Sequence, residues 1–135
     1  ERNLQADYVS LNTLLERSDF ISLHVPLLDS TRHLISHEQL KAMKKTAVIV
    51  NTARGPVIDE KALCEALKNG EIFAAGIDVF EFEPNPVDGL KDLPNIIFTP
   101  HIASATNEAR ECMSECAAEN IICVLHGMKP KNPVY

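Results

Sequence analysis

The amino-acid sequence predicts an α/β fold with a parallel sheet, because short apolar runs alternate with segments of helical period. The clearest run, 47–50, has four consecutive apolar residues without polar alternation, which is typical of a parallel strand covered on both faces. Strands and helices that alternate in short units are joined by right-handed crossovers. Further strands are expected at 19–25, 72–80 and 95–99, and a short one at 7–11.

Helix boundary signals occupy the segments between these runs. Ser36 and Gln39 have the spacing of a capping box. Asp59 can cap a helix over 60–68, which Gly70 would end in a left-handed turn. The other expected helices are a short one capped by Asn12 and running through Arg17, and a long one capped by Ser104 or Thr106 and running to about Leu125.

Composition narrows the class of protein. The 135 residues are 45% hydrophobic and carry a formal net charge of −6, which argues against an electrostatic partner such as nucleic acid or an anionic membrane. No apolar run approaches membrane-spanning length, and residues 1–4 do not resemble a signal peptide. The chain does not begin with methionine, so we expect it to be part of something longer.

Four cysteines indicate a reducing compartment and no metal site. Cys112, Cys116 and Cys123 share one face of the long predicted helix, and Cys64 lies in the helix before it. Their spacing matches neither a paired zinc motif nor a secreted disulfide framework. A metal site that includes His126 is the less favoured alternative. We expect small buried hydrophobic residues in a cytoplasmic protein.

Polar residues follow three of the expected strands. Arg54, Glu83 and His101 come after the runs at 47–50, 72–80 and 95–99 respectively. Because parallel strands end at one edge of their sheet, these side chains can converge in one crevice. These three residue types together suit carbonyl reduction. The arginine can orient a carboxylate or carbonyl, the histidine can transfer a proton, and the carboxylate can favour the protonated histidine.

One signal of a complete dinucleotide-binding domain is missing. The sequence contains no G-x-G-x-x-G turn, which normally follows the first strand and places a helix N-terminus at the pyrophosphate. The prediction is therefore a partial Rossmann-like, doubly wound parallel sheet that lacks its first strands and the glycine-rich turn.

Several ordered motifs resemble the D-isomer-specific 2-hydroxyacid dehydrogenases. The resemblance runs from about residue 6 to the C-terminus. Its motifs are 51–60 with Ala62-Leu63, 78–84 and 99–106, supported by 24–27 with Thr31 and by 43–45. It implies that Arg54 binds the 2-oxoacid, that His101 is the acid/base and that Glu83 pairs with His101. Glu81 is the alternative carboxylate, but the family's acid directly precedes the proline.

The resemblance also implies a cofactor, NAD, with NADP left open because the segment that selects between them is not in this sequence. The implied cofactor-lining residues are Pro26, Thr52, Ala53, Arg54, Asp78, His101 and Ser104. From the residues alone, Asp78 could instead be a helix or loop cap.

The same comparison implies how the chain is organised. Residues 1–105 would be the C-terminal part of the NAD-binding domain, and residues 106–135 a long helix and tail that return to an absent substrate domain. The strand at 19–25 would then have an open edge, and the chain alone would be inactive. Family members usually form homodimers, which is the expectation here.

The most favoured activity is hydride transfer between NAD(P)H and a small 2-oxoacid, because 100–110 resembles glyoxylate/hydroxypyruvate reductases. Phosphoglycerate dehydrogenase is an alternative suggested by the tail 131–134. A non-catalytic module that senses or binds NAD(H) is another. A formate dehydrogenase-like activity is disfavoured, since that branch has glutamine where this chain has Glu83.

Overall fold

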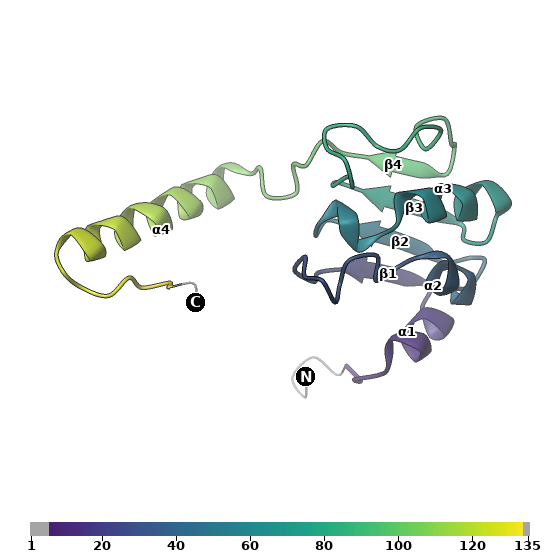
Figure 1. The fold of residues 1–135 in the computed structure, drawn as a ribbon, viewed down its shortest axis with the longest axis horizontal. Helices are drawn as coiled ribbons and strands as arrows, with labels where there is room; N and C mark the ends of the chain where they lie inside the picture. Colours follow the sequence, from purple (N-terminus) through teal and green to yellow (C-terminus); the bar gives the residue numbers. More distant parts are fainter. Residues whose placement is uncertain (1–5, 134–135) are drawn as a thin grey trace. The chain divides into compact units, whose positions relative to one another are not determined.

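The computed structural model describes residues 6–133. Within them, four short parallel strands form one sheet in the order β1-β2-β3-β4 (Figure 1). The strands are β1 (Phe20–Leu23), β2 (Val48–Asn51), β3 (Ala74–Ile77) and β4 (Ile96–Phe98). The predicted α/β fold is confirmed. β1, β3 and β4 are shorter than the segments predicted for them, and β2 is as long as its apolar run but begins one residue later.

Helices α2 (His37–Ala42) and α3 (Glu60–Asn69) begin at the predicted capping residues. In the first, Gln39 Oε1 accepts a hydrogen bond from the Ser36 backbone N–H at 3.2 Å, as a capping box requires. In the second, Asp59 Oδ1 accepts two backbone hydrogen bonds at 3.0 and 3.1 Å. Local side-chain chemistry therefore fixes both helix starts.

Helix α1 (Leu11–Arg17) replaces the strand expected at 7–11, and its cap is Ser10 rather than Asn12. Ser10 Oγ accepts a backbone hydrogen bond from the first turn at 3.3 Å. Leu15 is buried against the core from this helix. The expectation of a strand was wrong because the β-favouring residues before Ser10 have no strand beside them among the described residues.

The two faces of the sheet differ in how far they are covered by helices. The order of the strands in the sheet follows their order in the chain, so each new strand is added at the same edge. Right-handed crossovers then carry α2 and α3 to the same face. Ile49 and its neighbours on that face are buried, whereas Phe20 is 78% and Ile97 73% exposed on the other. On β2 itself the second face, with Val48 and Val50, is half-buried in this unit. Double winding would need strands that advance the other way, and the described residues include none.

Two compact units divide the chain, Glu1–His101 and Ile102–Tyr135. The second contains α4 (Asn107–Leu125), which begins at Thr106, where Oγ1 accepts a backbone hydrogen bond at 3.1 Å. Cys112 and Cys116 are exposed on α4, so the expectation that they are buried is wrong. Within its own unit the described part of the tail lies against α4 at Pro130 and Asn132, which is not enough to bury any residue of the helix. The proposed return of 106–135 to a substrate domain stays a prediction.

Candidate active site

The carboxyl ends of the strands lie side by side, which gathers the predicted site residues at one edge of the sheet. Asn51 at the end of β2 is in register with Leu23 of β1 and Ile77 of β3. Arg54 lies three residues beyond β2, and Asp78 follows β3 directly. This edge is where open α/β sheets bind ligands.

The turn that carries Arg54 is held by the side chain of Asn51. This amide is 1% exposed; its Nδ2 donates to the Arg54 carbonyl at 2.9 Å, and its Oδ1 accepts from the Ala53 backbone at 3.0 Å. The Arg54 side chain is exposed, and its Nη1 donates to the Ala53 carbonyl at 2.6 Å. Asn51 is a positioning residue that the sequence marks only as an amide ending an apolar run.

Gly55 brings the Arg54 turn against the segment that leads to Glu83. A Cβ added at Gly55 would lie 1.9 Å from the carbonyl oxygen of Phe80. Any larger residue would therefore push the two backbones apart.

His101 and Glu83 form the pair that the sequence predicts. His101 Nδ1 lies 3.0 Å from Glu83 Oε1 and 3.1 Å from Oε2. The hydrogen bond from His101 is the main reason that the pKa of Glu83 is lowered, and the positive charge of Arg54 adds to the effect. Both side chains are partly exposed, at 46% and 41%, so a small molecule can reach them.

The backbone of His101 has an unusual conformation that fixes its direction. Its φ is +55°, in the left-handed region, and its N–H donates to the Asp78 carbonyl at 2.8 Å. The carboxylate of Asp78 is buried and accepts a hydrogen bond from the Thr99 hydroxyl. Asp78 therefore joins β3 to the segment after β4 and does not cap a helix. Thr99 is a second supporting residue that sequence reasoning missed.

The alternative carboxylate, Glu81, has other partners. Its Oε1 lies 2.7 Å from His33 Nε2 and 3.3 Å from Arg32 Nη2. It is therefore Glu83, not Glu81, that contacts His101.

Two hollows at this edge are lined by predicted site residues. One, of about 620 Å³, is lined by Pro26, Thr52, Ala53 and Arg54, four of the residues expected at the cofactor, and also by His24. Sequence reasoning assigned no role to His24. The other, of about 130 Å³, is lined by five residues, among them His101 and Glu83.

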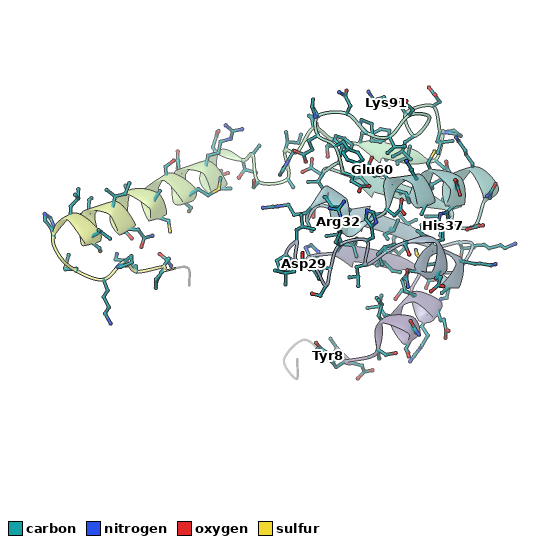
Figure 2. All side chains as sticks on the ribbon, viewed as in Figure 1. Tyr8, Asp29, Arg32, His37, Glu60 and Lys91 are labelled. Carbon is teal, nitrogen blue, oxygen red and sulfur yellow. The ribbon has the colours of Figure 1, made fainter. Side chains whose placement is uncertain are left out.

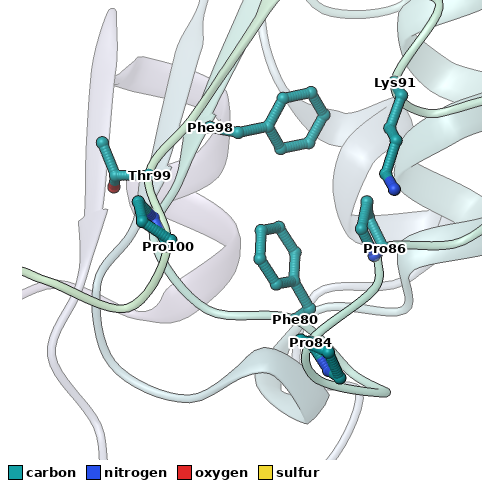
Figure 3. Close-up of a pocket in the computed structure, with 7 residues that line it drawn as sticks. All are labelled: Phe80, Pro84, Pro86, Lys91, Phe98, Thr99 and Pro100. Carbon is teal, nitrogen blue, oxygen red and sulfur yellow. The ribbon is translucent and has the colours of Figure 1, made fainter.

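Beside that pair is an apolar hollow of about 340 Å³ (Figure 3). The rings of Phe80 and Phe98 face it with centroids 6.0 Å apart, and Lys91 is its one charged lining residue.

The remaining predicted site residue, Ser104, belongs to the unit Ile102–Tyr135, so its place at the cofactor stays a prediction. Among residues 6–133, no three histidine, cysteine or acidic side chains cluster as metal ligands would. Nor does any described helix have the length and apolar character that crossing a bilayer requires.

A model of the NAD-binding domain of the D-isomer specific 2-hydroxyacid dehydrogenases matches residues 1–103. The chain belongs to this family. Its motifs therefore confirm the resemblance drawn from the sequence. The NAD-binding fold of this chain follows from that membership.

Two curated relatives are similar over nearly the whole chain. A glyoxylate reductase of Korarchaeum cryptofilum is 53% identical over 135 residues, which cover 99% of this chain and 41% of that protein. A glyoxylate/hydroxypyruvate reductase B of Serratia proteamaculans is 52% identical, with 99% and 42% covered. The chain thus spans about two fifths of the length of these relatives.

Solved structures of the family superpose closely. An NADPH-dependent glyoxylate/hydroxypyruvate reductase from Sinorhizobium meliloti, in complex with NADP and malonate, has a TM-score of 0.89 at 36% identity and covers 93% of this chain and 39% of that one. A glyoxylate reductase from Paecilomyes thermophila has a TM-score of 0.83 at 44% identity, with 86% and 35% covered.

Proposed function

We propose that the intact protein containing this chain reduces a small 2-oxoacid, glyoxylate or hydroxypyruvate, to the corresponding D-2-hydroxyacid with NADH or NADPH. The observation that carries the proposal is the His101–Glu83 pair, 3.0 Å apart at the same sheet edge as Arg54. Relatives more than 50% identical that are named glyoxylate reductase support the choice of substrate.

Each residue of the trio has one chemical task. The Arg54 guanidinium binds the substrate carboxylate and polarises the adjacent carbonyl, because its planar fork matches both oxygens. With Nδ1 engaged by Glu83, His101 donates its proton from Nε2 to the carbonyl oxygen. The Glu83 carboxylate holds the imidazole at Nδ1 and so fixes the direction of Nε2. When bound, the nicotinamide supplies the hydride that C2 of the oxoacid accepts, so that the carbonyl becomes a hydroxyl.

The residues of the larger hollow suit a nicotinamide cofactor. Pro26, Thr52 and Ala53 present short, mixed apolar and polar surfaces at the ends of β1 and β2, where a flat ring can approach the backbone. The pyrophosphate turn is not in this sequence, so we expect the 135 residues alone to bind NADH weakly and to be inactive. Micromolar affinity in a fluorescence titration of the isolated chain would contradict that expectation.

The test is oxidation of NADH and NADPH by the intact protein, followed by absorbance. We expect turnover with glyoxylate and hydroxypyruvate and little with 3-phosphohydroxypyruvate. Arg54→Lys keeps the charge but loses the fork, so KM for the oxoacid should rise about tenfold or more. The matched control is Arg17→Lys on α1, which should leave KM unchanged.

Other outcomes separate the alternatives. A preference for 3-phosphohydroxypyruvate would favour phosphoglycerate dehydrogenase. Tight NADH binding without turnover of any 2-oxoacid would refute the proposal and favour the sensing module.

We further propose that the protein is a cytoplasmic homodimer. The cysteines support the compartment, since all four are free thiols. The expectation of association rests on the family, whose members usually form homodimers. Light scattering of the intact protein measures the oligomeric state, and a monomer mass would contradict the dimer.

A further inference from the structure

We propose that the buried carboxylate of Glu60 positions Glu83 against His101 by holding both ends of the loop that carries Glu83. The inference deepens the proposed function and rests on it. Glu60 does not contact the reacting atoms in this scheme; it acts through the loop and is a positioning residue.

The contacts of Glu60 span that loop. Glu60 lies in the first turn of α3 (Figure 2). Its exposed fraction is 2%. Its Oε1 accepts a hydrogen bond from the backbone N–H of Glu81, and its Oε2 accepts one from Val87 at 2.9 Å. One carboxylate thus binds the backbone at Glu81, two residues before Glu83, and at Val87, four residues after it.

The loop between these anchors has little regular structure of its own. It forms no helix or strand, and its internal backbone support is a bridge between Phe82 and Asn85. Glu83 lies between the anchors and is exposed. The Glu83 carboxylate also accepts a hydrogen bond from the Phe80 backbone N–H at 3.4 Å, beside the end of the loop that Glu60 holds through Glu81. Its direction therefore depends on how the loop ends are held.

Burying a carboxylate costs free energy because the charged group loses its hydration. This cost indicates that the oxygens of Glu60 have a specific use. Burial raises the pKa of Glu60, while the two backbone hydrogen bonds oppose that change by favouring the charged form. An apolar side chain of similar volume would avoid the desolvation cost but would leave two backbone N–H groups unpaired. No apolar residue can make both contacts.

Glu60 also ties Glu83 to the substrate-binding arginine. Residues 54–60 form one short segment. It contains the Arg54 turn, Gly55, which lies close to Phe80, and Glu60. The segment 54–60 therefore meets the loop that carries Glu83 at two places, at Phe80 through Gly55 and at Glu81 and Val87 through Glu60. Because the Arg54 turn is held separately by Asn51, loss of the Glu60 contacts loosens Glu83 and leaves Arg54 in place.

The decisive variant is Glu60→Gln in the intact protein, which keeps the volume but replaces one acceptor oxygen with a donor. We expect kcat for the 2-oxoacid to fall about tenfold with KM within twofold, because proton transfer but not substrate binding is disturbed. Carboxyl ¹³C NMR should show the pKa of Glu83 rising toward its ordinary value as its bond to His101 loosens.

The direction of that change separates positioning from simple electrostatics. Removing a nearby negative charge would by itself lower the pKa of Glu83. The other groups that act on the Glu83 carboxylate are the Phe80 backbone N–H, which donates to its Oε1 at 3.4 Å, and the Arg54 guanidinium, and neither is substituted in the variant.

Two further variants make the test specific. Glu65→Gln on the same helix removes an equal charge from a side chain that is 64% exposed, and should change neither kcat nor the pKa of Glu83. In the Glu83→Gln background, Glu60→Gln should have no further effect on kcat, because the group it positions is gone.

An unchanged kcat together with an unchanged or lowered pKa of Glu83 overturns the proposal. Failure of Glu60→Gln to fold, seen by circular dichroism, also overturns it by assigning Glu60 a purely structural role. If the wild-type intact protein reduces no 2-oxoacid, the proposed function fails. The NMR readout still tests whether Glu60 positions Glu83.

Discussion

Two histidine–glutamate pairs of the same composition lie at this edge of the sheet. His101 pairs with Glu83, Nδ1 to Oε1 at 3.0 Å, and His33 pairs with Glu81, Nε2 to Oε1 at 2.7 Å. Both histidines have a left-handed backbone, at φ +55° and +50°, and both glutamates come from one loop. Composition and local geometry therefore do not distinguish a reactive pair from a structural one.

The surroundings do distinguish them. The Glu81 side chain is 7% exposed and also binds Arg32, so its charge is already matched inside the protein. Its backbone N–H is bound by Glu60. Glu83 is 41% exposed and lines a hollow with His101. The shielded pair fastens two loops together, whereas the accessible pair can meet a substrate.

Replacement of each histidine by asparagine is the sharpest test of this difference. Asparagine tolerates the left-handed backbone at both positions, so the two variants are matched. In the intact protein, His101→Asn should lower kcat for glyoxylate about 10²- to 10⁴-fold, the usual contribution of a general acid, with circular dichroism unchanged. His33→Asn should retain kcat within about threefold, as expected for a residue outside the reacting atoms.

Equal losses of kcat in the two variants would break the comparison. So would a His101→Asn enzyme that keeps most of its turnover.

The sequence predicts the accessible pair but not the shielded one. Glu83 precedes a proline in a family motif, which singles it out from Glu81 two residues earlier. From residues alone the two acids are equivalent, because an irregular loop has no periodicity that assigns a direction to each side chain. The partner of Glu81 lies 48 residues away, a separation that no local signal spans.

For the fold as well, features set by neighbouring residues were predicted and features set by distant residues were not. The helix caps at Ser36 and Asp59 were predicted correctly because capping is decided within four residues. The half-burial of the second face of β2 could not be predicted locally, because it depends on which elements the tertiary fold places against Val48 and Val50. Glu60 was missed for the same reason: an acid beside a helix cap indicates a solvated first turn, and only the tertiary fold buries it.

Replacing each glutamate with glutamine should show the reverse order of effects on stability. Glu81→Gln removes a shielded charge that contacts the Arg32 guanidinium and the His33 ring, and should lower the free energy of unfolding by about 1–3 kcal/mol. Glu83→Gln removes an exposed charge and should cost less than about 1 kcal/mol. Urea denaturation of the intact protein measures both. A larger loss from Glu83→Gln would mean that the accessible pair also holds the fold together.

The smallest expected effect is the dependence of stability on pH that the accessible pair adds. The pKa of Glu83 is lowered in the folded protein, chiefly by His101, from an ordinary value of 4.5. A carboxyl whose pKa is lower in the folded than in the unfolded state stabilises the fold above the unfolded value. That contribution disappears as the pH falls through the folded value. The urea midpoint of the wild-type protein should therefore exceed that of Glu83→Gln slightly at pH 6.

The difference should shrink as the pH falls below about 4.5 and vanish at lower pH, because the wild-type carboxyl is then neutral in both states. In the His101→Asn background, the same substitution should give a nearly pH-independent difference, since the main cause of the lowered pKa is absent. A difference that grows as the pH falls would mean that Glu83 is held in its neutral form. Glu83 could then not favour a protonated His101, and only its exposure would separate the accessible pair from the shielded one.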